Sequence, residues 1–289
     1  MTRYTPRTQL FEDLTSDEIA EAARNGAMVL VPTGAIEQHA RHLPVKTDIH
    51  LSSTVARLAA AKVGAVPVLV APGLPFGFSP HHVSHAGTIS LRLGTFLSVL
   101  RDVATSLVES GFKRVVFVNG HGGNNAPLRS LVGELVTDGL PVAALDYWVP
   151  GEPKWIPRLK GALRRGGHAC EQETALVLAL EHGNDAAWME AALRGLPPRV
   201  IQPWIAGDWP DDPLTEYGAA WPPVFQADDC GYYGDPGVAT RATGEVLLEI
   251  IVDELAAFLA RFAATPLRLG VARDADRPGI SPPIAERGK

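Results

Sequence analysis

Residues 27–32 read AMVLVP, a continuous apolar run that is typical of a strand buried on both faces of a sheet. Three similar runs follow at residues 66–71, 114–118 and 142–145. Apolar residues recur at helical spacing before and between these runs, over residues 17–25, 49–63, 95–109 and 127–137. Buried strands that alternate with helices predict an α/β fold with a mostly parallel sheet covered on both faces.

The second half of the chain is less regular. A helix is predicted over residues 170–180, and residues 196–235 are dense in Pro, Gly, Trp and Asp, which predicts a long ordered loop. A long helix is predicted over residues 236–262, followed by a polar tail after Thr265. Neither a repeat nor a linker interrupts the pattern, so we expect one domain over residues 1–289.

Composition excludes several classes of partner. The 289 residues are 46% apolar and 20% charged, with a formal net charge of −6. Nucleic acid and anionic membranes need clustered Lys and Arg, so neither is expected as a partner. The N-terminus resembles no signal peptide, no apolar run reaches the roughly 18 residues of a membrane span, and there are only two cysteines. We therefore expect a cytoplasmic protein.

Ionisable residues gather directly after the first predicted strand. Residues 34–44 read GAIEQHARHLP, and together with Asp48 they place Glu37, His39 and His42 within a short loop. Loops at the carboxyl ends of parallel strands are where binding sites gather. Carboxylate and imidazole groups suit Zn, Mn or Fe, so the cluster predicts a metal site, with a solvated polar turn as the alternative.

A second cluster, NGHGGNN at residues 119–125, follows the strand of residues 114–118 and precedes a helix. Glycines let the backbone approach a ligand closely, and the free N–H groups of a helix start can stabilise an oxyanion. A phosphate-binding loop or a simple tight turn is the alternative. The nucleotide-loop interpretation is disfavoured because the chain lacks GxxxxGK[ST] and GxGxxG.

Two further segments add candidate groups. Residues 168–174 read HACEQET at the start of a predicted helix, where acidic residues are also favoured by the helix dipole. Cys170 in this segment is either a nucleophile or, as we favour, a small packing residue. Residues 77–85 contain three histidines, which are candidates for ligands, substrate contacts or surface residues.

In combination, the segments PTGAIEQHARHLPVKTD, NGHGGN and HACEQET resemble the creatininase (creatinine amidohydrolase) family. The PHH…AGTISL stretch and the GDP…AT motif extend the resemblance over most of residues 28–260. The resemblance implies a three-layer α/β/α fold. It also implies a divalent metal cofactor, Zn or Mn with Fe as a further option, bound as one or two ions per subunit. A homo-oligomer, typically a hexamer, is the implied assembly.

The resemblance also implies a ligand set. Glu37, Asp48 and His121 would hold one metal, while His39 and Asp48 would hold the other, with Asp48 as the bridge. In creatininase the second metal also takes a Glu two residues after the NGH histidine, and that position is Gly123 here. We expect Glu173 to supply this carboxylate; the alternative is that only one metal binds tightly.

The predicted activity is hydrolysis of a cyclic or linear amide in a small polar molecule, a non-peptide C–N bond, by metal-bound hydroxide. His168 and Glu173 are the predicted proton-handling residues. The residues predicted to contact the substrate are His82, Gly122, Trp155 and Arg164. The alternatives are a formamide hydrolase, a hydrolase of a C–C bond in an oxo-polyol, and a non-catalytic accessory protein with the same fold.

Overall fold

The computed structural model describes residues 4–162, 165–197 and 225–271 of the chain. At its centre lies a four-stranded sheet in the order β2-β1-β3-β4, and every neighbouring pair is parallel. The strands are β1 (Met28–Thr33), β2 (Val68–Val70), β3 (Val115–Asn119) and β4 (Val142–Asp146). The parallel sheet predicted from the four apolar runs is therefore confirmed, with each strand at or within two residues of its predicted position.

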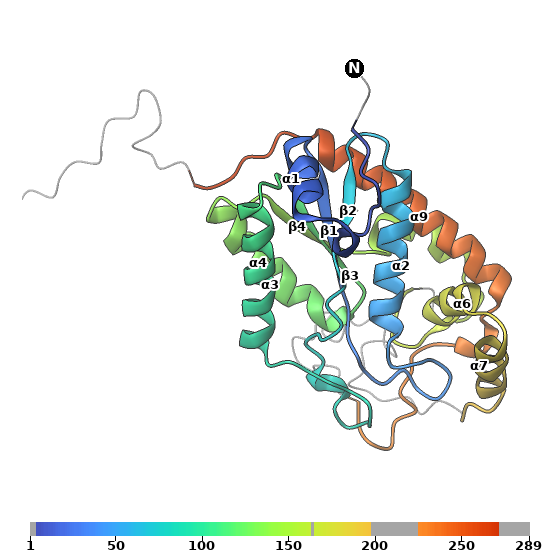
Figure 1. Cartoon of the computed structure of the whole chain (residues 1–289). Coiled ribbons are helices and arrows are strands. Elements are labelled where there is room, and N and C mark those ends of the chain that lie inside the picture. Colours follow the sequence, from blue (N-terminus) through green and yellow to red (C-terminus); the bar gives the residue numbers. More distant parts are fainter. Residues whose placement is uncertain (1–3, 163–164, 198–224, 272–289) are drawn as a thin grey trace, which may run out of the picture.

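Helices cover both faces of this sheet (Figure 1). The α-helices are α1 (Ser16–Arg24), α2 (Thr47–Lys62), α3 (Leu93–Glu109), α4 (Asn125–Thr137), α5 (Glu152–Trp155), α6 (Glu171–Leu180), α7 (Asn184–Arg194) and α9 (Arg241–Ala264). Short 3-10 turns lie between them: η1 (Phe11–Asp13), η2 (Pro80–His82), η3 (Gly122–Asn124), η4 (Val149–Gly151), η5 (Ile156–Arg158) and η7 (Pro236–Val238).

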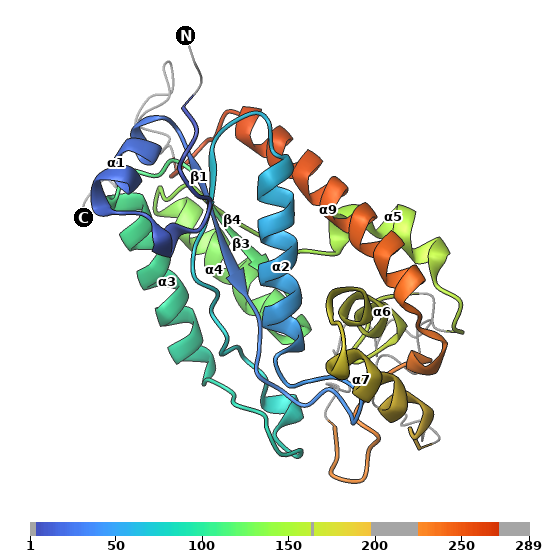
Figure 2. The same cartoon turned by 45° about the vertical axis from the view of Figure 1, so that its right-hand side comes forward.

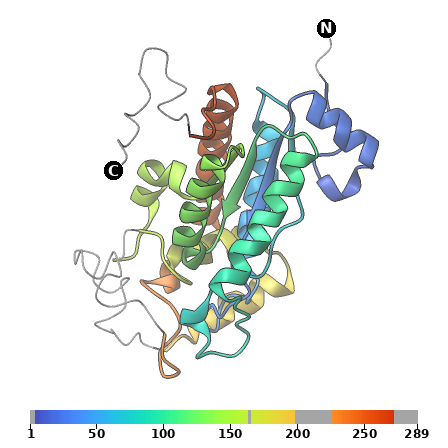
Figure 3. The same cartoon turned by 90° about the vertical axis from the view of Figure 1, so that its left-hand side faces the viewer.

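Alternate residues of each strand enter two different hydrophobic cores. Met28 and Leu30 of β1 pack with α2, α6 and α9, whereas Val29 and Val31 pack with α1, α3 and α4. Successive side chains of a strand point to opposite faces, which is why one continuous apolar run supplies both cores. Figure 2 shows α2 and α9 on one side of the sheet and α1 and α3 on the other, and in Figure 3 the red α9 lies behind the sheet. This arrangement is the predicted α/β/α architecture.

Helix α6 packs closely against α9 and also contacts α2. Gly244 of α9 lies directly against Ala175 of α6, so that a Cβ at position 244 would collide with the Ala175 backbone. A small residue at a helix crossing lets two backbones approach closely. The consequence is that the N-terminal turn of α6, which carries Glu173, is held beside α2.

The predicted helix over residues 236–262 differs from the structure. A 3-10 turn, Pro236–Val238, comes first, and α9 begins only at Arg241. Ala239 is extended, and the Thr240 side chain accepts a hydrogen bond from the Thr243 N–H at 3.1 Å. This N-cap starts a new helix and explains the break.

Helix α7 was not predicted, because its mixed alanines and polar residues carry only a weak apolar stripe. The predicted loop over residues 196–235 falls largely outside the described residues, as does most of the tail after Thr265. Among the residues that the structure describes, no helix is long and apolar enough to span a membrane.

Candidate metal centre

Two glycine-containing loops bring the predicted ligands together at the carboxyl ends of β1 and β3. Gly34 follows β1 and Gly120 follows β3, and each lies against the start of α2. A Cβ at Gly34 would collide with the Ile49 backbone, and one at Gly120 with the Asp48 carbonyl. Glycine is therefore required at both positions for the two loops to close on Asp48.

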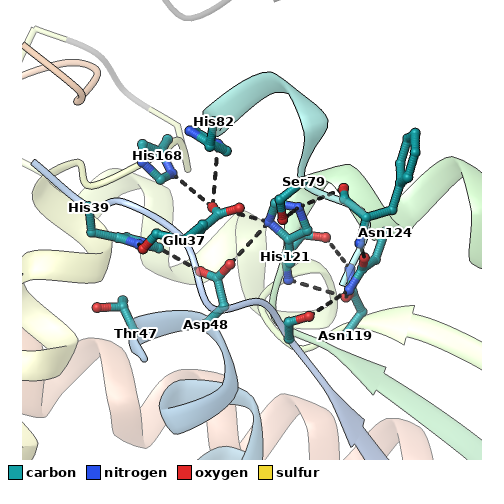
Figure 4. A network of polar contacts seen from close by, with 12 residues as sticks. Glu37, His39, Thr47, Asp48, Ser79, His82, Asn119, His121, Asn124 and His168 are labelled. Atoms are coloured by element: carbon teal, nitrogen blue, oxygen red, sulfur yellow. Dashed lines mark hydrogen bonds and ion pairs between the residues drawn. The ribbon is translucent and has the colours of Figure 1, made fainter. Parts of the chain in front are cut away.

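Asp48 occupies the first turn of α2 and is 2% exposed. Its two oxygens face two different histidines: Oδ1 lies 3.0 Å from His39 Nε2, and Oδ2 lies 3.0 Å from His121 Nδ1. Figure 4 shows Asp48 between these two rings, with Glu37 beside them. The Asp48 carboxylate thus has the placement of a group that bridges two sites.

Glu37 completes the first of these sites. The residue is fully buried, and its Oε1 lies 3.2 Å from His121 Nδ1. Among the described residues, the only polar groups near Glu37 Oε1 and Asp48 Oδ2 are histidine nitrogens, and Glu37 Oε2 has no hydrogen-bond partner. Buried carboxylates are costly unless they are paired or coordinate a cation. Potential ligand atoms of Glu37, His39 and Asp48 all lie within 4.8 Å of one another, so this donor set fits a divalent metal ion.

The outer nitrogens of His39 and His121 support the same conclusion. His39 Nδ1 lies 3.2 Å from the Glu37 backbone oxygen, and His121 Nε2 lies 3.1 Å from the Phe78 backbone oxygen. A carbonyl can only accept, so in a neutral ring each of these nitrogens carries the proton. The nitrogens that face the carboxylates are then free to act as metal ligands, as is usual for metal-binding histidines.

Glu173 lies on the His39 side of the cluster. Its Oε2 accepts a hydrogen bond from the Ala169 N–H at 2.6 Å and lies 3.8 Å from His39 Nε2. Ala169 adopts the left-handed region with φ 48°, a conformation that side-chain-bearing residues rarely take and that here directs the Ala169 N–H to Glu173. Potential ligand atoms of His39, His168 and Glu173 lie within 4.8 Å of one another, so these residues form a second group that could hold a metal ion.

Gly123 is closed to a side chain in this arrangement. A Cβ at this position would collide with the His121 ring and the Phe78 carbonyl. A side chain at residue 123 would therefore require these groups to move.

The charge balance of the cluster requires positive charge. Burial opposes protonation of His121 and His39, yet Glu37 and Asp48 raise the pKa of His121 well above its ordinary value, and Asp48 and Glu173 raise the pKa of His39 to about 9. Burial raises the pKa of Glu173 to about 8. Burial acts in the same direction on Glu37, but His121 and His82 hold its pKa well below the usual range. A divalent cation would balance these carboxylates in place of the protons.

His82 and His168 approach the same Glu37 oxygen as His121. His82 Nε2 and His168 Nδ1 lie 3.4 Å and 3.3 Å from Glu37 Oε1. The Phe225 ring stacks on His82 at a centroid distance of 4.8 Å. Sequence analysis did not identify Phe225, because it follows an irregular stretch with no periodic signal.

The other predicted substrate contacts are spread more widely. Gly122 is exposed at the start of η3, with open space where a Cβ would stand. Trp155 is fully buried in the core, and its indole N–H donates to the Trp148 carbonyl at 2.9 Å. Trp155 therefore lies in the hydrophobic core and not beside the open space at Gly122, because burial of its large apolar ring is favourable. Arg164 lies outside the described residues.

Two neighbours of the site have supporting positions. His42 Nε2 lies 2.9 Å from the Thr174 hydroxyl, next to Glu173 in the chain, and burial lowers the pKa of His42 to about 3. Cys170 is 2% exposed, and burial raises the pKa of its thiol to about 12. A protonated, buried thiol is a poor nucleophile, which supports the packing interpretation of Cys170.

An amide network holds the loop of His121 in place. The Asn119 side-chain amide donates to Asp146 Oδ1 at 2.6 Å and to the His121 carbonyl at 2.6 Å. The Asn124 side chain donates to the Gly34 carbonyl at 3.0 Å and so links the two glycine-containing loops. Sequence analysis missed these roles, although Asn119 and Asp146 end neighbouring strands and are polar in otherwise apolar runs.

Comparison with known proteins places this site in context. The family model described as "Creatininase: Creatinine amidohydrolase" matches residues 12–259. The "Mycofactocin precursor peptide peptidase" of Mycobacterium tuberculosis is 28% identical over 270 residues, which cover 91% of this chain and 96% of that protein. The "Creatinine amidohydrolase" of Pseudomonas putida is 28% identical over 256 residues, which cover 82% of this chain and 90% of that protein.

Solved structures show the same fold. A crystal structure of creatinine amidohydrolase (creatininase) has a TM-score of 0.64 and 26% identity, covering 90% of this chain and 100% of that one. Two further creatininase structures, one described as the Mn form and one as a Zn–Zn type, have TM-scores of 0.63 and 0.61 at 25% identity, covering 88% of this chain and 98% of each. Creatininase neighbours thus carry Mn or Zn, and the present chain has a buried cluster able to bind a divalent metal.

Proposed function

The chain belongs to the creatininase family, a family of metal-dependent hydrolases, and from this we propose that it hydrolyses an amide C–N bond. The observation that carries this proposal is the position of Asp48. Each of its carboxylate oxygens lies 3.0 Å from a different buried histidine. This is the arrangement expected of a carboxylate that bridges two metal ions.

We assign the ligands as follows. Glu37, Asp48 and His121 would hold one ion, and His39, Asp48 and Glu173 the other. Support comes from the buried carboxylates of Glu37 and Asp48, whose Oε1 and Oδ2 atoms have only histidine nitrogens as polar neighbours, and from the distance of 3.8 Å between Glu173 Oε2 and His39 Nε2. Divalent ions bound there supply Lewis-acid activation of water and of the carbonyl group.

The surrounding residues then serve the leaving group and the substrate. His168 is partly buried beside His39, with ring centroids 4.3 Å apart, and is the residue that we propose to pass a proton to the leaving nitrogen. His82 lies on the same side of Glu37. Gly122 is exposed next to His121, and the open space beside it would accommodate a substrate. Trp155 and Arg164 carry no assignment in this proposal.

We propose a small polar amide, cyclic or linear, as the substrate. Its support is the similarity to the creatinine amidohydrolase of Pseudomonas putida. A peptide bond is the second candidate, favoured by the similarity to the mycofactocin precursor peptide peptidase at equal identity and higher coverage. The cleaved bond is a C–N amide bond in both cases. Homo-hexameric assembly and a cytoplasmic location stay predictions, which light scattering and cell fractionation would test.

The proposal is tested by replacing the bridging carboxylate. An Asp48→Asn protein is expected to lose bound metal and to lose activity by more than roughly 100-fold, beyond the 10–100-fold typical of outer residues. Metal content by mass spectrometry and turnover of lactams, linear amides and short peptides are the measurements. Asp102→Asn, the same change at an exposed position of α3, is the matched control. Full metal content and activity in Asp48→Asn would show that the site is elsewhere.

A further inference from the structure

Gln38 stands between the two predicted ligands Glu37 and His39, yet its side chain contacts a different pair of histidines. Its amide nitrogen lies 3.0 Å from His82 Nδ1 and 3.0 Å from His168 Nε2. These two rings belong to segments that are 44 and 130 residues away from Gln38. Gln38 is 4% exposed, so water does not compete for these contacts.

The orientation of the Gln38 amide is fixed by the backbone. Its Oε1 accepts a hydrogen bond from the Ala40 N–H at 2.9 Å. A flipped amide would set its NH2 group against this N–H donor, so the flip is excluded. Ala40 adopts the left-handed region with φ 55°, which turns its N–H back toward Gln38.

Two consequences follow for the histidines. The Gln38 NH2 group has two protons and no acceptor, so it must donate one proton to His82 Nδ1 and one to His168 Nε2. Each ring nitrogen that accepts is unprotonated, so each ring is held neutral, with its proton on the other nitrogen. The protonated nitrogens, His82 Nε2 and His168 Nδ1, are the ones 3.4 Å and 3.3 Å from Glu37 Oε1.

We propose that Gln38 is a positioning residue that locks His82 and His168 in the tautomers that present N–H groups to Glu37 and to the substrate side of the site. The inference rests on the proposed function and deepens it, because it makes His168 a neutral ring that donates a hydrogen bond through its Nδ1–H group in the resting enzyme. It also distinguishes two kinds of cluster. Glu37, His82 and His168 have atoms close enough to hold a metal, but two of these atoms carry protons.

The residues around Gln38 make room for its amide and hold the two histidine rings in place. Gly231 has φ 74°, and a Cβ there would collide with Gln38 Oε1, so this glycine leaves room for the amide. Phe225 packs against both rings, with centroid distances of 4.8 Å to His82 and 5.3 Å to His168. The ring planes are therefore held by packing while Gln38 selects the position of the proton.

The test is a direct observation of the tautomers. Zn-loaded protein with 15N-labelled histidine is examined by long-range proton–nitrogen NMR, with His82→Gln and His168→Gln proteins to assign the signals. The expected result is a proton on Nε2 of His82 and on Nδ1 of His168. The opposite tautomers, or a zinc-bound nitrogen in either ring, would overturn the proposal. This readout does not depend on activity, so it separates the inference from the proposed hydrolysis.

The Gln38→Glu variant tests the cause. A carboxylate of the same shape can only accept, so both protons are expected to move to His82 Nδ1 and His168 Nε2. In that protein kcat on an amide that the wild type cleaves is expected to fall roughly 10–100-fold with unchanged metal content. Gln38→Met, which also removes the amide, gives the second readout if Gln38→Glu does not fold; its tautomers are expected to become mixed.

Gln172→Glu is the matched control. Gln172 is 2% exposed and bonds Tyr147, so the substitution adds the same charge near the site without a contact to His82. Its histidine signals are expected to keep the wild-type tautomers. Wild-type tautomers in both Gln38 variants, or a tautomer change in Gln172→Glu, would contradict the assigned role of Gln38.

Discussion

The site contains two pairs of histidines, all buried except the partly buried His168, and the pairs differ in the partner of one ring nitrogen. The metal-facing pair, His39 and His121, and the amide-held pair, His82 and His168, all lie within 3.4 Å of a carboxylate oxygen. In the metal-facing pair the far nitrogen contacts a backbone carbonyl, whereas in the amide-held pair it contacts the NH2 group of Gln38. Similar near surroundings therefore lead to opposite chemistry, because the far partner decides which nitrogen carries the proton.

Substituting one histidine from each pair tests the difference between the pairs most directly. His121→Gln is expected to lower metal affinity by more than about 100-fold. The reason is that this change removes a proposed metal ligand and not merely a residue that orients a ligand. His82→Gln is expected to retain the wild-type metal content and to lose activity. Metal titration and turnover are measured on both proteins.

Each protein serves as the control of the other, since both changes remove one buried imidazole. Equal loss of metal from both would mean that the two pairs are not distinct. Circular dichroism would verify that both proteins fold.

A smaller effect is expected at the second metal position. Glu173→Gln should reduce the metal content from two ions to one, because only the His39 side loses a carboxylate. Glu171→Gln, two residues away, is the control: the Glu171 carboxylate accepts backbone N–H groups of Lys160 and Gly161 at 2.8–3.0 Å. Loss of these bonds should lower stability by about 1–3 kcal/mol while both ions stay bound.

Metal stoichiometry and urea unfolding together distinguish these outcomes. Two tightly bound ions in Glu173→Gln would show that Glu173 is not a ligand of the second ion. Only a single ion in the wild-type protein would contradict the two-metal assignment itself.

The smallest effect is expected from a single methyl group in the loop of His121. Gly123→Ala should weaken metal binding by roughly 10-fold, because its Cβ would push on the His121 ring and on the Phe78 carbonyl that orients it. Gly122→Ala is the control, since nothing lies within 4 Å of a Cβ at that position. Metal titration of the two proteins measures the difference, and equal affinities would show that the outer contact of His121 does not matter.

Much of the fold could be predicted because strands and helices depend on the spacing of apolar residues over short stretches of sequence. Four apolar runs identified β1 to β4, and helical spacing identified α1, α2, α3, α4 and α6. The break before α9 was missed because Thr240 acts through a cap, which interrupts a helix without altering its apolar spacing. For Trp155 the sequence predicted a role that the structure does not show: the residue was predicted to contact the substrate, but its side chain packs in the core.

The sequence by itself determined the sheet, the loops at the carboxyl ends of its strands, and the grouping of Glu37, His39 and Asp48 near one helix start. Only the tertiary structure brought Glu173 to His39, through the close packing of α6 on α9, and only it set Gln38 between His82 and His168. The physical reason is that periodicity and spacing act over a few residues. A hydrogen-bond partner, and with it the proton on an imidazole, is chosen through space by whatever segment the fold places there.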